Sequence, residues 1–208
     1  MTYKVKEIYY TLQGEGAQAG RPAVFCRFTG CNLWTGREKD REKAVCQFCD
    51  TDFVGTNGIN GGKYSVQQLA KKVREVWRHD VKGYVVCTGG EPALQLDAAL
   101  IDAFHAENME VAIETNGTIE LPKNIDWVCV SPKAGSECIV TSGDELKLVF
   151  PQRGAEPELF MHWTFKNYFL QPMDGVFQKI NSELAVKYCL DHPQWRLSVQ
   201  THKYLNIP

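Results

Sequence analysis

Short apolar runs alternate with helix-like stretches along most of this chain, and this alternation limits the folds open to it. The runs are rich in β-branched residues, and the stretches between them repeat apolar residues at helical spacing. This pattern indicates strand–helix units around a mostly parallel sheet, so we predict an α/β fold. The predicted strands cover residues 23–28, 84–87, 111–114, 127–130, 145–150, 168–170 and 196–201.

Three helices are predicted around these strands. Ser65 and Gln68 have the spacing of a capping box, so a helix is expected over residues 65–79. A second helix should follow Pro92, and a third should cover residues 177–190. Each should turn apolar residues toward the core, among them Leu69, Val73, Leu100, Phe104, Ile180 and Leu184.

The length of 208 residues suits one domain. A complete eight-stranded (β/α) barrel usually needs about 250 residues. We therefore predict that residues 1–208 form a single domain, an incomplete TIM-like (β/α) barrel of six to seven mostly parallel strands. A charged insertion is expected at about residues 32–45.

Composition excludes several classes of function. The chain is 44% hydrophobic and 23% charged, as in ordinary globular proteins, and its net charge of −2 gives no sign of a nucleic-acid-binding surface. The first residues lack the apolar core of a secretory signal, and no segment approaches the roughly 20 apolar residues needed to cross a bilayer. We expect a cytoplasmic protein with no nucleic-acid or membrane partner.

Eight cysteines are many for a reducing compartment, so metal binding is the leading explanation for any that cluster. Cys31, Cys46 and Cys49 form a C-x14-C-x2-C pattern after the first predicted strand. Structural zinc sites usually have four protein ligands, whereas three cysteines on a cubane iron–sulfur cluster leave one iron open. The remaining cysteines lie in or near apolar runs and should be core residues: Cys26, Cys87, Cys129, Cys138 and Cys189.

Cysteine spacing alone leaves two other interpretations open. One is a structural zinc site whose fourth ligand is His79, His105 or Cys87. The other is a thioredoxin-like redox pair, which lacks the usual strand–helix context and leaves Cys31 without a role.

The next apolar run ends in a glycine-rich turn, Thr88-Gly89-Gly90-Glu91-Pro92. Such a turn offers free backbone groups at the carboxyl end of a strand, where α/β folds bind ligands. It is suited to the ammonium and carboxylate of an amino acid, and a simple tight turn is the alternative.

Together the two motifs resemble the radical S-adenosylmethionine (SAM) superfamily, whose usual cysteine spacing is C-x3-C-x2-C. One branch, the 7-carboxy-7-deazaguanine synthase family, is known for variation in this spacing, and the resemblance to it covers nearly the whole chain. It is carried by the segments YTLQGEG (10–16), RPAVFCRFTGCNLW (21–34), CDTDF (49–53), TGGEP (88–92), ETNG (114–117), SPK (131–133), QPMD (171–174) and QTHKYLNIP (200–208).

The resemblance implies an incomplete (β/α) barrel that is usually a homodimer. The implied reaction is ring contraction of 6-carboxy-5,6,7,8-tetrahydropterin to 7-carboxy-7-deazaguanine with loss of ammonia, a lyase step in queuosine biosynthesis. The implied cofactors are a [4Fe-4S] cluster, SAM and Mg²⁺. An electron donor such as flavodoxin is the implied partner.

The resemblance also implies individual roles, with Thr51 reaching Mg²⁺. The implied catalytic residues are the cluster ligands Cys31, Cys46 and Cys49, with Glu114 and His202. The implied SAM-binding residues are Phe48, Cys49, Asp50, Gly90, Glu91, Ser131, Pro132, Lys133, Gln171, Pro172, Met173 and Asp174. The implied substrate-binding residues are Leu12, Gln13, Gly14, Glu15, Arg27, Thr88, Glu114, Asn116, His202 and Pro208.

Several of these side chains suit a carboxylated pterin. Arg27 can form a bidentate pair with a carboxylate, which a lysine cannot reproduce. Gln13, Glu15, Glu114 and Asn116 carry amide and carboxylate groups suited to a guanidine-like ring edge. The structural alternatives are a surface arginine and a buried salt-bridge partner at position 114.

Other implied site residues have structural alternatives as well. Lys133 and Asp174 would otherwise be a solvated charge and a helix cap. His202, expected near the end of the last strand, would donate to the substrate or transfer a proton, or would be a core histidine. The carboxylate of Pro208 is expected against the pterin, which predicts sensitivity to a carboxyl-terminal tag.

Two other functions remain open from the sequence. A zinc-stabilised binding module would contain zinc and no iron or sulfide. A radical SAM activase would make a glycyl radical on a partner protein, but the chain shows no segment for an additional ferredoxin-like cluster.

Overall fold

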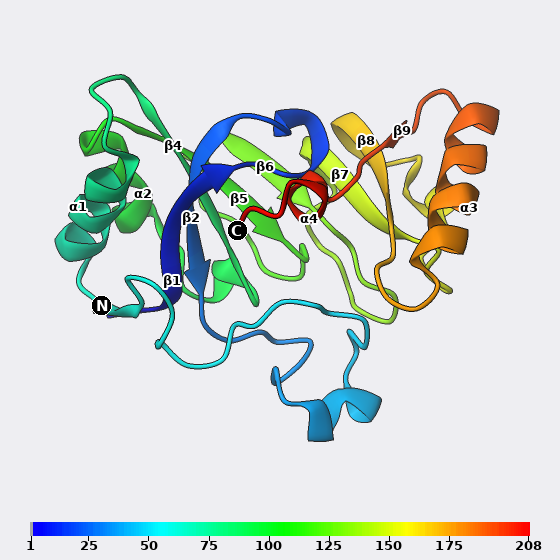
Figure 1. Ribbon diagram of the computed structural model, residues 1–208, viewed down its shortest axis with the longest axis horizontal. Helices are drawn as coiled ribbons and strands as arrows, with labels where there is room; N and C mark the ends of the chain where they lie inside the picture. The colour runs from blue at the N-terminus through cyan, green and yellow to red at the C-terminus, as the bar shows by residue number, and fades with distance from the viewer. Residues whose placement is uncertain (1) are drawn as a thin grey trace.

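The structure is a computed structural model that describes residues 2–208, and its centre is one nine-stranded sheet (Figure 1). The strand order is β3-β1-β2-β4-β5-β6-β7-β8-β9. The strands are β1 Tyr3–Leu12, β2 Pro22–Phe28, β3 Gly62–Tyr64, β4 Gly83–Gly89, β5 Met109–Thr115, β6 Trp127–Val130, β7 Ser142–Phe150, β8 Thr164–Pro172 and β9 Arg196–Leu197. The α-helices are α1 Val66–Trp77, α2 Ala98–Ala106, α3 Gln178–Asp191 and α4 Thr201–Leu205, and the 3-10 helices are η1 Gly16–Gln18, η2 Glu38–Lys43, η3 Pro92–Leu94 and η4 Pro157–Phe160.

The sheet is mostly parallel and open. Six parallel pairings join the strands from β2 to β9, and each of the seven predicted strands overlaps a strand of this parallel part. β3 and β9 form the two edges of the whole sheet, which is therefore not a closed barrel, and the expected incomplete barrel is confirmed.

The predicted strand number is too low, because the sequence does not predict the antiparallel strands β1 and β3. In β1 the register shifts between Val5 and Glu7. Such a bulge disturbs the alternation of buried and exposed side chains that marks a strand in a sequence. The very short β3 borders a glycine-rich loop and gives no strand signal.

The carboxyl-terminal region also differs from the prediction of a strand over residues 196–201. β9 covers only Arg196–Leu197, and helix α4 begins at Thr201. The chain turns away from the sheet here, because the backbone N–H of Thr201 donates to the carbonyl of Gly14 at 3.0 Å. His202 consequently belongs to α4 and not to a strand end.

Two of the predicted helices begin where their capping residues dictate. The capping box of Ser65 is present, and α1 follows it directly. α2 begins at Ala98, later than predicted, because Pro92–Leu94 forms η3 first. The side chain of Asp97 then caps α2 by accepting from the backbone N–H of Leu100.

α3 lies close to its predicted range, but the side chains that it turns toward the core are not the predicted ones. Ile180 and Leu184 are 54% and 43% exposed, whereas Asn181 and Ala185 are buried. The apolar residues of this helix are spread around its circumference, so periodicity gives no reliable inward face.

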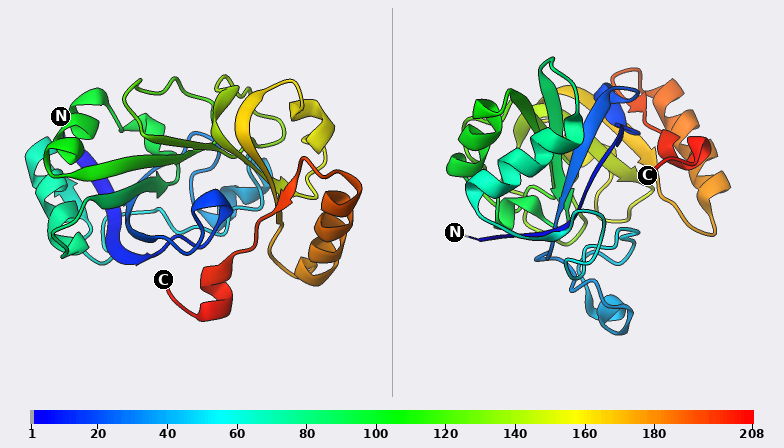
Figure 2. Two further views of the ribbon diagram at one scale, coloured as in Figure 1. Left: turned by 90° about the horizontal axis from the view of Figure 1, so that it is seen from above. Right: turned by 60° about the vertical axis from the view of Figure 1, so that its left-hand side comes forward.

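α1 and α2 cover one part of the sheet, and α3 packs on β8 and β9 at the other end (Figure 2). Leu69 and Val73 of α1 join Leu100 and Phe104 of α2 in the largest buried apolar cluster. The loops that follow the parallel strands enclose a cavity. Within residues 2–208, every helix is too short or too polar to span a membrane.

Candidate active site

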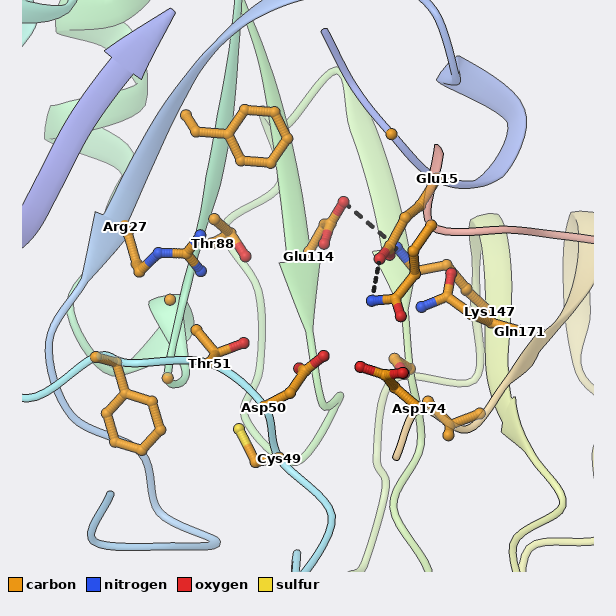
Figure 3. A pocket seen from close by; sticks show the side chains of 18 of the residues that line it. Glu15, Arg27, Cys49, Asp50, Thr51, Thr88, Glu114, Lys147, Gln171 and Asp174 are labelled. Carbon is orange, nitrogen blue, oxygen red and sulfur yellow. Dashed lines mark hydrogen bonds and ion pairs between the residues drawn. The ribbon is translucent and has the colours of Figure 1, made fainter. Parts of the chain in front are cut away.

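One cavity of about 440 Å³ collects most of the residues singled out in the sequence. This volume lies within the range of small-molecule sites. The predicted site residues line the cavity, with the exceptions of Glu91 and Pro132. Figure 3 shows Cys49, Asp50 and Thr51 near one end of the cavity and Glu15, Glu114 and Lys147 near the other.

Glu91 does not line the cavity but has a structural role. Its carboxylate is completely buried and accepts hydrogen bonds from the backbone N–H groups of Ala93 and Asn116 and from the hydroxyl of Thr115, at 2.7–2.9 Å. Burial raises the pKa of Glu91, and these donors oppose the rise. The side chain thereby ties the glycine-rich turn to the end of β5.

The glycines of this turn permit close packing against the loop that carries Cys31. A Cβ atom on Gly89 would lie 2.2 Å from the carbonyl oxygen of Phe28, and one on Gly90 would lie 2.1 Å from that of Gly30. The φ of +134° at Gly89 also favours glycine. The turn therefore supports the first cysteine as well as lining the cavity.

Hydrogen bonds hold together the two ends of the long segment between Cys31 and Cys46. The carbonyl of Leu33 accepts hydrogen bonds from the backbone N–H groups of Val45 and Cys46, at 3.1 and 3.3 Å. The residues between them, including η2, form the excursion at the bottom of Figure 1. The first cysteine and the C-x2-C pair thus line the same cavity despite the 14 intervening residues.

Backbone donors and a lysine surround the three thiols, all of which are free. Burial raises the pKa of Cys31, and the N–H groups of Leu33 and Trp34 oppose this rise. Burial likewise raises the pKa of Cys46, against the nearby charge of Lys133. The N–H donors and Lys133 favour the thiolate form against the larger effect of burial, and they suit a negatively charged cluster.

The alternative of a structural zinc site finds no suitable ligand set. No three His, Cys, Asp or Glu side chains within residues 2–208 converge as the ligands of one metal ion. Cys87 is buried in the core, His105 pairs with Asp126, and His79 contacts Tyr10. A cubane has no need of such convergence, because each thiolate binds a different iron.

Lys133 lies beside the C-x2-C pair. Its ammonium donates to the carbonyl and hydroxyl of Ser131 at 2.8 and 2.6 Å, and it lies 5.9 Å from the ring centre of Phe48. Burial lowers the pKa of Lys133, while Cys46 and Cys49 oppose that change. The lysine brings positive charge to the cluster end of the cavity.

A buried ion-pair network occupies the opposite end, and sequence reasoning missed its central residue. The ammonium of Lys147 lies 2.6 Å from a carboxylate oxygen of Glu15 and 3.4 Å from one of Glu114 (Figure 3). Gln13 donates to Glu114 at 2.8 Å. Burial opposes a charged Lys147, but the two glutamates raise its pKa above the ordinary value.

Arg27 is held by two side chains of β1 that sequence reasoning also missed. Its Nε donates to Glu7 at 2.8 Å, and one terminal nitrogen donates to the hydroxyl of Tyr9 at 3.0 Å. Glu7 and Tyr9 line the same cavity. The remaining donors of the guanidinium are available to a ligand carboxylate.

The carboxyl-terminal segment lies across the cavity. The hydroxyl of Thr11 donates to a Pro208 oxygen at 2.9 Å. A Cβ atom on Gly14 would lie 2.3 Å from Nδ1 of His202, so glycine is required for this contact. The imidazole is therefore packed against the loop after β1.

A second bridging lysine, also missed from the sequence, joins α4 to the predicted SAM-binding residues. The Lys203 ammonium lies 2.8 Å from Asp50 and 2.5 Å from Asp174. Asp174 does not cap α3, since the residue at that position is Phe177 and no side chain caps the helix. The sequence did not indicate this contact, because residues 196–201 were predicted to be a strand.

Comparisons with known proteins agree with this architecture. A model of the radical SAM superfamily matches residues 41–140. The chain is 62% identical to the 7-carboxy-7-deazaguanine synthase of Caulobacter vibrioides and 61% identical to that of Bordetella pertussis, each over the full length of both chains. It also resembles the crystal structure of QueE from Escherichia coli, with a TM-score of 0.74 and 28% identity over 96% of this chain and 94% of that one.

The open parallel sheet, the three free thiols that line one cavity with the glycine-rich turn, and the family match define a radical SAM enzyme. Sequence identity above 60% to two relatives, over the full length of both chains, narrows the class to one family. The chain belongs to the 7-carboxy-7-deazaguanine synthase family.

Proposed function

We propose that this chain converts 6-carboxy-5,6,7,8-tetrahydropterin to 7-carboxy-7-deazaguanine with loss of ammonia, as a step of queuosine and 7-deazapurine biosynthesis. The observation that carries the proposal is one cavity with three thiols at one end and paired polar side chains with Arg27 at the other. We also propose that residues 1–208 act as one domain with an insertion at about residues 32–45. The free cysteines suit a reducing cytoplasm.

Cys31, Cys46 and Cys49 hold the cluster, and Lys133 partly offsets its negative charge. When bound, the cluster and SAM together supply the radical chemistry that starts the reaction. The backbone at Gly90 and the side chains of the wall hold and orient SAM. The implied wall residues are Phe48, Asp50, Ser131, Gln171, Pro172, Met173 and Asp174.

At the opposite end, Arg27 binds the substrate carboxylate with the donors left free by Glu7 and Tyr9. Gln13 and Glu114 are already hydrogen-bonded to each other and present a polar edge to the pyrimidine ring. Thr88 and Asn116 complete the polar wall, and the two buried ion pairs fix the carboxylates in place.

His202 and Pro208 belong to a segment tied to the loop after β1. The packing of His202 on Gly14 fixes the ring, so that a nitrogen can donate to the substrate or carry a proton. The Thr51 hydroxyl is the protein ligand we propose for Mg²⁺, which commonly retains waters and uses substrate oxygens.

Two partners belong to this proposal. An electron donor such as flavodoxin reduces the cluster, and a second copy of the chain forms a homodimer. Val176, Phe177, Ile180 and Leu184 are between 43% and 94% exposed on and before α3, and this apolar surface supports an interface.

The test is anaerobic incubation of the reconstituted protein with SAM, a reductant and the carboxypterin, followed by mass analysis. We expect 7-carboxy-7-deazaguanine and 5′-deoxyadenosine, with neither product when the reductant is omitted. SAM cleavage that gives no product from the pterin would overturn the substrate assignment. Zinc in place of iron and sulfide would overturn the enzyme assignment.

A further inference from the structure

Arg41 connects the insertion to the C-x2-C turn formed by residues 46–49. One terminal nitrogen of its guanidinium donates to the carbonyls of Gln47 and Cys49, at 2.8 and 3.1 Å. Its other donors pair with Glu38 at 2.6 and 2.7 Å. No sequence motif or resemblance assigns a role to this arginine.

The guanidinium is also fixed from the opposite side. Its central carbon lies 4.0 Å from the ring centre of Trp34, within cation–π distance. Trp34 is buried and packs edge-on against Phe53. Arg41 is therefore held between an aromatic side chain and the carbonyls of the turn, and is not a freely solvated charge.

The contact with Gln47 has a consequence on the other side of the peptide bond. In a trans peptide the C=O and the next N–H point in opposite directions. With the Gln47 carbonyl turned toward Arg41, the N–H of Phe48 points away from the guanidinium, on the side of Cys46, and it opposes the rise that burial causes in the pKa of that thiol. Arg41 thus orients a donor that reaches a cluster ligand.

We propose that Arg41 is a positioning residue of the cluster site, which holds the turn for cluster binding and raises the reduction potential of the cluster. N–H···S bonds and nearby positive charge both favour the reduced, more negative cluster. This inference rests on the proposed function, since that function requires the cluster. It also gives the charged insertion a role at the site.

Arginine suits this role better than lysine. The planar guanidinium can stack on Trp34, pair with Glu38 and donate to two carbonyls simultaneously. A lysine retains the charge but not the fixed fork of donors. Arg41→Lys should therefore separate the electrostatic contribution from the positional one.

The test compares wild type, Arg41→Gln, Arg41→Lys and the control Arg37→Gln as reconstituted full-length proteins. Arg37 is an exposed arginine of the same insertion, without a side-chain contact to the turn among the described residues. The measurements are the midpoint potential by EPR-monitored titration and the rate of anaerobic cluster loss to a chelator.

We expect Arg41→Gln to shift the potential to a more negative value and to lose its cluster about tenfold faster, as for lost outer-shell partners of a metal site. Arg41→Lys should lose the cluster faster than wild type with a smaller shift in potential. Arg37→Gln should match wild type. Identical potentials and loss rates for Arg41→Gln and Arg37→Gln would overturn the proposal.

If Arg41→Gln accepts no cluster, amide hydrogen exchange in the cluster-free proteins replaces these measurements. Faster exchange confined to the residue 46–49 turn in Arg41→Gln supports the proposal, and unchanged exchange there overturns it. A wild-type chain that assembles no cluster would instead refute the proposed function, while the exchange comparison still decides the role of Arg41.

Discussion

The two ends of the cavity are built differently. At the cluster end, Cys31, Cys46 and Cys49 all lie outside regular strands and helices. At the opposite end, Arg27 belongs to β2 and Lys147 to β7, and their side chains are paired within the protein. The first end depends on loop hydrogen bonds and the second on the sheet.

Because of this difference, substitutions at the first end should affect cluster binding, and substitutions at the second should affect the stability of the fold. Loop thiols contribute little to the packed core, so changes there should affect the cluster far more than the fold. Charges carried by strands and buried against one another are part of the fold, so their removal should affect unfolding as well. Matched substitutions at the two ends test this distinction.

The largest effect on function is expected for Cys49→Ala. Loss of one of three thiolates should reduce iron content and SAM cleavage by more than the roughly 100-fold that loss of an outer-shell partner can cost. The free energy of unfolding should change by about 1 kcal/mol or less. Iron analysis and urea unfolding of the cluster-free protein measure the two effects.

The matched control is Cys189→Ala, which removes the same group from α3, outside the cavity lining. It should retain the cluster and SAM cleavage. Equal loss of iron in both variants would show that cysteine content, and not the cavity trio, governs cluster binding.

The largest effect on stability is expected for Lys147→Met. This substitution leaves Glu15 and Glu114 without their shared cation in a buried site, so the free energy of unfolding at pH 7 should fall by about 3–5 kcal/mol. Denaturant unfolding of the cluster-free protein provides the measurement. A loss below 1 kcal/mol would contradict the view that this end is part of the fold.

The same ion pair predicts a pH dependence. Burial alone would raise the pKa of Glu15, but Lys147 and Gln200 lower it below the ordinary value of 4.5. The carboxylate therefore stabilises the fold fully above pH 4.5, and this contribution disappears as the pH falls through the lowered folded-state pKa. Acid unfolding curves of wild type and Lys147→Met should converge on acidification.

The sequence predicted the parallel sheet and the thiols because both leave local signals. Lys147 also left a signal: Glu145 and Lys147 alternate with the buried Leu146 and Leu148, which assigns them to the opposite face of the strand. Its partners lie in the loop after β1 and in β5, far away in the sequence, so no local pattern could identify them.

The site residues of the carboxyl-terminal segment were not predicted for a different reason. The signal for a strand over residues 196–201 was misleading because Thr201 pairs with Gly14, far away in the sequence. Such a tertiary contact overrides local propensity. The contacts of Lys203 could be recognised only after α4 was placed.

An intermediate effect is expected for Arg27→Ala. The loss of a charge-assisted contact with the substrate carboxylate should cost about 1.5–3 kcal/mol, or roughly 10- to 150-fold in kcat/KM. Glu7 and Tyr9 would still flank the site, and the cluster should remain intact. Steady-state kinetics with iron analysis tests this, and cluster loss in the variant would contradict the assignment of Arg27 to the substrate end.

The smallest effect on stability is expected for Lys203→Met, the closest counterpart of Lys147→Met. Both lysines bridge two carboxylates, but the Lys203 side chain is 39% exposed and that of Lys147 only 6%. Water screens the exposed pairs, so the free energy of unfolding should change by less than about 1 kcal/mol, with a weaker effect in high salt. Urea unfolding at low and high salt measures this. If Lys203→Met destabilises the protein as strongly as Lys147→Met, burial is not what distinguishes these two networks, and the carboxyl-terminal segment must be counted as part of the fold.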